Sequence, residues 1–287
     1  MHIGDLRTQY HARICHEIIR IQPKGKHGAY PNFADGSNLS SVKIAWGIVR
    51  QLGCTDNYNT LKGQTTGGRF ETLTRDFLQD AFSLLQHLRP GNWVYSTTQT
   101  AISGFEQYAH LAYLEKVVSS DTNLSAALGG DYIVKPDIVI SRIPVSDDEI
   151  NQNAALVQAD LPYARFSPLR RANRDENRAI LHASISCKWT IRSDRAQNTR
   201  TEALNLIRNR KGNLPHIVAV TAEPLPTRLA ALALGTGDLD CVYHFALPEL
   251  QQAIEEIGNH DQLDMLNILT EGNRLRDISD LPFDLAI

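Results

Sequence analysis

Three short segments in the C-terminal half of the chain constrain its fold most, because each has the pattern of a β-strand. Residues 183–189 alternate between polar and apolar side chains, as a half-buried strand does. The segments 216–221 and 240–245 are mostly apolar and indicate buried strands. Helices are expected over about 200–211 and from 248 to about 257. Strands that alternate with helices indicate an α/β sheet flanked by helices.

The rest of the chain supplies more helix, one further strand and several loops. Turn-forming residues mark 23–41 as loop, and apolar residues at helical spacing run from Phe70 to Leu88 before Pro90-Gly91 ends the pattern. The other expected elements are helices over 42–53 and 105–118, a loop over 54–68, a β-rich stretch over 131–140 and an irregular or weakly helical stretch over 144–178. We expect a single domain, 1–287, whose core spans about 131–246, with a helical and loop-rich part, 1–118, packed on it.

The composition excludes several classes of protein. No apolar run reaches the roughly 18 residues that a membrane helix needs. The start of the chain lacks the apolar core of a signal peptide, so we expect a soluble, intracellular protein. The glycine-rich stretches lack the residues of a P-loop or of a dinucleotide fingerprint. The four cysteines lie far apart without a CxxC pair, which argues against both a zinc cage and a disulfide scaffold: Cys15, Cys54, Cys187 and Cys241.

The net charge is small, but the charges are unevenly distributed. The chain carries 29 Lys and Arg against 32 Asp and Glu, for a net charge of −3. Basic residues nevertheless gather in 165–178 and 188–211, whereas acids gather in 237–287. Such an asymmetry is typical of a surface that binds a polyanion, and a solvated helix face is the alternative.

A dispersed set of charged residues indicates phosphodiester chemistry. Pro136-Asp137 opens an apolar strand, and strand periodicity puts Ser186 and Lys188 on one face of a second strand, with Glu202 further along the chain. Mg²⁺ binds carboxylate oxygens and keeps several waters. Hydrolysis of a phosphodiester needs neutralised charge and an activated water. Asp137 with a second acid can hold the metal, and Lys188 can orient or help deprotonate the water.

Each of these residues also has a structural alternative. Lys188 can be the exposed end of an edge strand, and Asp137 can be a turn residue after Pro136. Thr199-x-x-Glu202 matches a capping box, so Glu202 can simply begin a helix. Spacing alone does not decide between these alternatives and a Mg²⁺ phosphodiesterase.

The stretch His182–Asn198 closely resembles the core of the NgoMIV-type enzymes, which are type II restriction endonucleases of the CCGG-recognising group. This family has the PD-(D/E)XK fold, a mixed central sheet flanked by helices, with one catalytic acid displaced. An acid usually stands two residues before the lysine. Here Ser186 occupies that position, and the resemblance assigns the acid to Glu202 on the following helix. The similarity also covers Pro136-Asp137 and the segments 34–38, 214–218, 235–237 and 277–282.

The resemblance implies a role for each residue of the catalytic site. Asp137 resembles the central metal ligand, with the backbone carbonyl of Cys187 beside it, while the Cys187 thiol should point away. Lys188 resembles the water-orienting lysine, Glu202 the relocated acid, and Glu71 an auxiliary acid near the metal. A glutamate in the first turn of a helix ordinarily just favours the helix dipole, which is the alternative for Glu71.

The same resemblance assigns residues to DNA recognition. Arginine can donate twice to guanine O6 and N7, and aspartate can accept from cytosine N4, so Arg192, Asp194 and Arg195 can read a G·C-rich major groove. In the family this segment reads the inner CCGG. Asp35 and Arg228 resemble the residues that read the outer G·C pair. Gln64 resembles a residue that contacts the minor groove, and Ser37 resembles a supporting residue. A plain turn is the alternative for Asp35-Gly36.

These expectations describe a Mg²⁺-dependent type II restriction endonuclease that cleaves double-stranded DNA. By resemblance its target is GCCGGC, cut after the first G to leave 5′ CCGG overhangs. A palindromic target implies a homodimer, and the family implies a homotetramer. The resemblance also implies a prokaryotic cytoplasm and a cognate DNA methyltransferase as a functional partner.

Two alternatives belong to other functional classes. A repair or recombination nuclease on the same fold would have no sequence preference, and the cluster of Arg192, Asp194 and Arg195 argues against it. A DNA-binding regulator would have no chemistry, and the intact set of Asp137, Lys188 and Glu202 argues against that.

Overall fold

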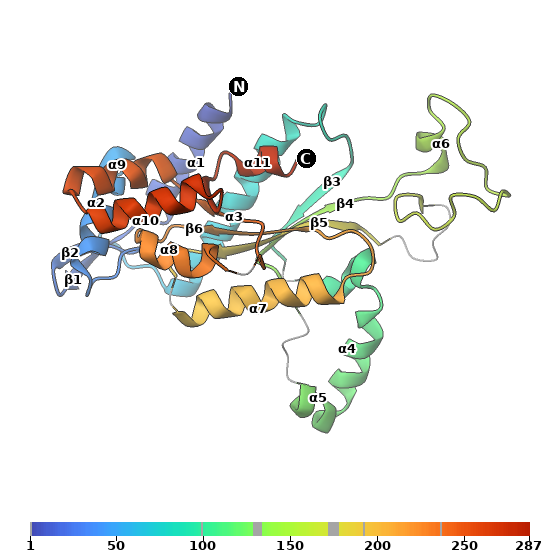
Figure 1. Ribbon diagram of the computed structural model, residues 1–287, viewed down its shortest axis with the longest axis horizontal. Coiled ribbons are helices and arrows are strands. Elements are labelled where there is room, and N and C mark those ends of the chain that lie inside the picture. Colours follow the sequence, from blue (N-terminus) through green and yellow to red (C-terminus); the bar gives the residue numbers. More distant parts are fainter. Residues whose placement is uncertain (1, 99, 129–133, 172–177, 192, 236) are drawn as a thin grey trace.

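A six-stranded sheet forms the centre of the computed structural model (Figure 1), which describes residues 2–98, 100–128, 134–171, 178–191, 193–235 and 237–287. The strands follow the order β3 (Trp93–Ser96), β4 (Ile138–Arg142), β5 (Ile180–Lys188), β6 (His216–Thr221), β7 (Cys241–His244) and β8 (Leu275–Asp277). The three strands that most constrained the sequence analysis are confirmed as β5, β6 and β7. The predicted mixed α/β class is confirmed as well.

The sheet changes direction at β5. The strand β4 is antiparallel to both of its neighbours, β3 and β5, whereas β5, β6, β7 and β8 are parallel. The pairing aligns Ile138 with Ile185 and Lys188 with Thr221. The beginning of β4 therefore lies beside the end of β5, and the residue that precedes Ile138 reaches the same edge as Lys188.

Helices cover both faces of this sheet. In Figure 1, α1 (Ile3–Glu17), α3 (Gly63–Ser83) and α11 (Leu281–Asp284) lie above it, and α7 (Ser193–Asn209) lies below. The other helical elements are α2 (Leu39–Gln51), η1 (Ile102–Gly104), η2 (Glu106–Tyr108), α4 (Leu111–Ser120), α5 (Thr122–Leu128), α6 (Asp147–Ile150), α8 (Pro226–Ala233), α9 (Leu247–Ile257) and α10 (His260–Glu271). Fully buried apolar side chains fill the core, including Phe70, Leu78, Ile140, Ile185 and Val220.

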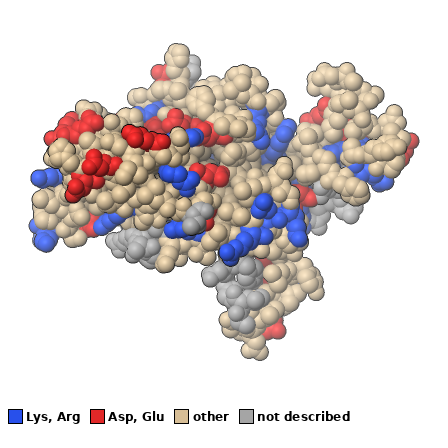
Figure 2. All heavy atoms as spheres, in the orientation of Figure 1, with Lys and Arg blue, Asp and Glu red and all other residues tan. Residues whose placement is uncertain are grey.

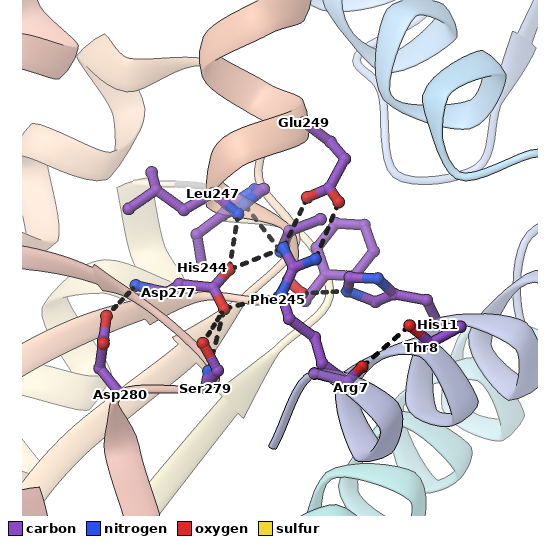
Figure 3. A network of polar contacts seen from close by, with 12 residues as sticks. Arg7, Thr8, His11, His244, Phe245, Leu247, Glu249, Asp277, Ser279 and Asp280 are labelled. Carbon is purple, nitrogen blue, oxygen red and sulfur yellow. Dashed lines mark hydrogen bonds and ion pairs between the residues drawn. The ribbon is translucent and has the colours of Figure 1, made fainter. Parts of the chain in front are cut away.

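A polar network ties α1 to the C-terminal elements (Figure 3). Arg7 donates to Glu249 of α9 at 2.6 Å and to Asp277 of β8 at 2.9 Å. His11 Nε2 lies 2.7 Å from the carbonyl oxygen of Phe245. All three charged side chains are largely buried, so removing one would leave its partners without their counter-charge. These contacts fix the N-terminal helix α1 to β8, the edge strand of the sheet, and to α9.

Two stretches expected as loops contain regular elements. Within 23–41, β1 (Ile21–Gly25) and β2 (Gly28–Pro31) form a hairpin, and Gly28 adopts the left-handed φ of +90° that its turn requires. The expected loop over 54–68 is partly helical, because α3 already begins at Gly63. There the packing of α3 against α1 outweighs the low helix propensity of its glycines.

Three further expectations need correction. The helix expected over 200–211 begins at Ser193, and the one expected over 105–118 is divided between η2 and α4. Cys15 and Cys54 form a disulfide, with Cα atoms 5.1 Å apart, although the cysteine spacing argued against one. The fold brings the end of α1 beside the turn after α2, which spacing along the chain does not reveal. Across the described residues, no helix is long and apolar enough to cross a membrane.

Charges of opposite sign occupy different parts of the surface. In Figure 2, acidic side chains gather at the upper left, over α9 and α10, where Glu255 and Asp261 are exposed. Basic side chains gather near the C-terminal end of α7, where Arg208, Arg210 and Lys211 are exposed. The asymmetry predicted from the sequence is therefore also an asymmetry in space.

Candidate active site

A cavity of about 660 Å³ opens at the edge of the sheet where β4 begins and β5 ends. Asp137 precedes β4 and Lys188 ends β5, while Glu71 of α3 and Glu202 of α7 approach from the helices on either side. The antiparallel pairing of β4 with β5 brings Asp137 and Lys188 together, although 51 residues separate them along the chain.

Asp137 is the centre of a set of hydrogen bonds. Its Oδ2 accepts from the backbone N–H of Cys187 at 2.7 Å and from Lys188 Nζ at 2.8 Å. The hydroxyl of Ser186 also donates to this oxygen, at 3.4 Å. The side chains of Asp137 and Lys188 are 20% and 21% exposed, so the pair faces the cavity rather than the core.

The charged groups of this cavity perturb one another. Burial raises the pKa of Glu71, and the charge of Asp137 adds to the effect. Burial likewise raises the pKa of Glu202. For Lys188, burial lowers the pKa, but the charge and hydrogen bond of Asp137 outweigh it and raise the pKa overall. Lys188 is therefore a charged ammonium held on a carboxylate, beside two acids whose ionised forms are disfavoured.

Cys187 borders the cavity through its backbone. Its N–H faces Asp137, and in an extended strand the carbonyl of a residue faces the same neighbour as its N–H. The thiol lies on the other face of β5, buried near Thr74, and burial raises its pKa well above the usual value. The thiol thus belongs to the core, whereas the backbone carbonyl lies on the Asp137 side.

The oxygen donors of this cavity suit a hard divalent cation. Mg²⁺ is usually bound through one or two carboxylates and keeps several waters. The carboxylates of Asp137, Glu71 and Glu202 line one cavity. Among the described residues, no three His, Cys, Asp or Glu side chains are close enough to hold an ion by themselves. The donors that this cavity offers are carboxylate and backbone oxygens, which are the ligand types that Mg²⁺ takes.

A second cavity, of about 770 Å³, adjoins the first. In it Arg228 of α8 forms an ion pair with Asp35, and Ser37 donates its hydroxyl at 2.6 Å and its N–H at 3.0 Å to Asp35 Oδ1. The hydrogen bonds from Ser37 and Arg228 lower the pKa of Asp35 to about 2. An arginine and an ionised carboxylate therefore line this cavity, and such groups can donate to guanine and accept from cytosine. Three residues line both cavities: Gln22, Asn32 and Thr190.

Known proteins resemble this chain over nearly its whole length. A sequence model of the NgoMIV restriction enzyme family matches residues 10–287. The chain belongs to the NgoMIV restriction enzyme family. It is 52% identical over 282 residues to the type II restriction enzyme NgoMIV of Neisseria gonorrhoeae, covering 96% of this chain and 97% of that protein. It also matches the crystal structure of the type IIF restriction endonuclease Bse634I with cognate DNA at 13% identity and a TM-score of 0.31, over 96% of this chain and 91% of that one.

Membership of the NgoMIV family decides between the functional classes that the sequence left open. The chain is a type II restriction enzyme, a site-specific deoxyribonuclease. The alternatives of a DNA-binding regulator without chemistry and of a nuclease without sequence preference are therefore wrong.

Two structural alternatives also fail for this member of the NgoMIV family. Glu202 cannot begin a helix, because α7 starts at Ser193 and leaves Thr199 and Glu202 well inside it. Glu71 does not lie in a first turn, because α3 starts at Gly63. Both acids occupy the middle of a helix and line the cavity that also holds Asp137 and Lys188.

The residues predicted to bind DNA fall into three groups. Asp35, Ser37 and Arg228 share the second cavity, and Gln64 lines the first. The third group is the segment that resembles the inner CCGG reader of the NgoMIV family. Arg192 lies outside the described residues. Asp194 and Arg195 occupy the first turn of α7, but their side chains are not among the described parts of the structure.

Sequence reasoning missed one buried acid of the second cavity. Glu223 follows β6 in the loop that leads to α8, and its side chain is 1% exposed. One of its carboxylate oxygens accepts from the backbone N–H of Ile191 at 3.0 Å. A single glutamate beside a proline carries no periodicity or spacing signal, so only the fold reveals this contact.

Proposed function

We propose that this restriction enzyme is Mg²⁺-dependent and cleaves double-stranded DNA at GCCGGC, after the first G, to leave 5′ CCGG overhangs. The observation that carries the proposal is the adjacency of the two cavities. One holds Asp137, Lys188, Glu71 and Glu202, and the other holds the Arg228–Asp35 pair. A cut beside the outer base pair requires its reader to stand next to the catalytic groups, and this arrangement meets that requirement.

In the proposed chemistry, Asp137 and the backbone carbonyl of Cys187 would hold the metal. When bound, the cation supplies charge neutralisation at the phosphate and acidity to a water ligand. Lys188 donates one ammonium N–H to Asp137 Oδ2, and its other N–H groups would orient the attacking water. Glu202 and Glu71 complete the acidic wall of the cavity, and burial raises the pKa of each carboxyl group.

In the proposed recognition, three residues around the start of α7 read the inner CCGG: Arg192, Asp194 and Arg195. Arg228 and Asp35 read the outer G·C pair from the second cavity, with Ser37 fixing the carboxylate of Asp35. Gln64 lines the catalytic cavity from α3 and is proposed to contact the minor groove.

The proposed assembly follows from the symmetry of the target. A palindromic duplex presents two equivalent half-sites, so a two-fold homodimer cuts both strands, and we propose that two dimers join as a homotetramer. Each chain is proposed to form one domain, 1–287, with its core at about 131–246. The proposed setting is a prokaryotic cytoplasm, with a cognate DNA methyltransferase as functional partner.

A plasmid digest tests this proposal. Discrete fragments whose ends lie within GCCGGC, formed with Mg²⁺ and absent with EDTA, are expected, whereas ends within another sequence would refute the target. Asp137→Ala should abolish cleavage but keep affinity for GCCGGC in Ca²⁺, because it removes a metal ligand and no base contact. Cleavage by this variant within about tenfold of wild type, a barrier change of only about 1.4 kcal/mol, would contradict the metal assignment.

A further inference from the structure

Glu223 joins the two elements to which base reading is assigned. Its Oε2 accepts from the N–H of Ile191 at 3.0 Å, immediately before the segment that starts with Arg192. Its Oε1 lies 3.8 Å from Arg228 Nη1 and accepts from the N–H of Leu225 at 3.4 Å, just before α8. Oε2 of this buried carboxylate therefore contacts the backbone just before α7, and Oε1 contacts the start of α8.

The backbone around Glu223 holds this carboxylate in place. The N–H of Glu223 donates to Thr221 Oγ1 at 3.1 Å, and Thr221 is the fully buried last residue of β6. The side chain thus extends from the end of a central strand toward the base of the second cavity. Because these contacts fix the carboxylate of Glu223, its position sets where Ile191 and Arg228 can lie.

The buried position of Glu223 works against the ionised form of its carboxyl group. Burying a carboxylate is costly, and Arg228 is too distant from Glu223 for a hydrogen bond and is shared with Asp35. Consistent with this cost, burial raises the pKa of Glu223 to about 7. A neutral amide has one acceptor oxygen and could accept only one of these N–H groups, whereas the carboxylate accepts one on each oxygen and also faces Arg228.

We propose that Glu223 is a positioning residue for target recognition, which sets the Arg228–Asp35 pair and the backbone of Ile191 in a fixed relation to each other. The inference rests on the proposed function, because it assumes that these residues read GCCGGC. Arg228 stands between two carboxylates, one on each side, and its side chain is still 35% exposed and free to meet a base from the cavity.

Glu223→Gln tests the inference, with Glu249→Gln as the matched control. Glu249 is also a glutamate paired with an arginine in a partly buried site, but it lies in the Arg7 network away from both cavities (Figure 3). Affinities are measured in Ca²⁺ for duplexes carrying GCCGGC, the outer-pair variant ACCGGT, or a random sequence. Ratios between duplexes are compared, because a ratio measured on one preparation is independent of its folded fraction.

We expect Glu223→Gln to lower the preference for GCCGGC over ACCGGT by about tenfold, equivalent to about 1.4 kcal/mol, with affinity for random duplex unchanged. In an Arg228→Ala background the same substitution should cause no further loss of that preference. Glu249→Gln should keep the preference, whatever its melting temperature.

Three results would overturn the inference: full preference in Glu223→Gln, an equal loss of affinity for all three duplexes, or the same loss of preference in Glu249→Gln. A wild-type enzyme that does not itself distinguish GCCGGC from ACCGGT would instead refute the proposed target. The two failures are therefore distinguishable in one experiment.

Discussion

Replacing Glu202 with glutamine should separate catalysis from folding. Glutamine has nearly the same shape and helix propensity, and no cap is lost, because α7 begins at Ser193 and Glu202 lies well inside it. Burial raises the pKa of Glu202, so the folded protein holds the charged form less favourably than water does. The free energy of unfolding should therefore stay within about 0.5 kcal/mol of wild type, or rise.

The rate of cleavage should respond very differently. If Glu202 acts on the charges of the catalytic cavity, its neutralisation should slow cleavage at least about 100-fold, or about 2.7 kcal/mol of activation free energy. The assay is single-turnover cleavage of a GCCGGC duplex, with thermal denaturation of the same preparation. Glu255→Gln, an exposed glutamate within α9, is the matched control and should change neither quantity.

Two outcomes would refute this reasoning. Near-normal cleavage by Glu202→Gln would show that the charge of Glu202 is not needed for catalysis, although Glu202 lines the cavity. A slow rate accompanied by a fall in melting temperature of several degrees would mean that Glu202 mainly supports the packing of α7.

Three further predictions concern recognition, pH and the disulfide. Arg195→Ala should reduce affinity for GCCGGC far more than affinity for random duplex, whereas Arg208→Ala, at the other end of α7, should weaken both alike; equal effects in Arg195→Ala would refute base reading. Burial lowers the pKa of His182 to about 4, so the unfolded chain binds its proton first as pH falls from about 6.5, and up to about 3 kcal/mol of stability should be lost by pH 4. Chemical unfolding across this range should have a shallower pH dependence in His182→Gln, and an unchanged slope would contradict the assignment. Replacing Cys15 and Cys54 with serine should cost about 4 kcal/mol by the loop-entropy argument for their separation of 39 residues, and a melting temperature that does not respond to a reductant would refute the bond.

The sequence predicted the buried parallel strands β6 and β7 well, because a strand that is buried on both faces consists of a nearly continuous run of apolar residues. The segment 216–221 matches β6 residue for residue, and the strand predicted over 183–189 overlaps β5, which starts three residues earlier and ends one residue earlier. Strand alternation also separated Ser186 and Lys188 from Cys187 correctly, since a period of two needs no knowledge of the rest of the fold.

Elements whose stability comes from distant contacts were harder to predict. Glycines obscure the start of α3 at Gly63, which packing against α1 stabilises. Thr199 and Glu202 match the sequence pattern of a capping box, which predicts a helix start, but α7 begins at Ser193 and contains both residues. Among the site residues, resemblance and not spacing led to Glu71, and nothing in the sequence indicated Glu223.

The length of α7 has a mechanical consequence. Arg195 and Glu202 lie seven residues, or about two turns, apart on one continuous helix. An unbroken helix transmits a tilt at one end to every residue along it, so a displacement of its first turn also moves the position of Glu202. Under the proposed roles, the first turn of α7 reads bases and Glu202 acts in the cavity, so one rigid helix couples recognition to cleavage. An acid on β5 would lack this coupling, because the sheet holds that strand on both sides.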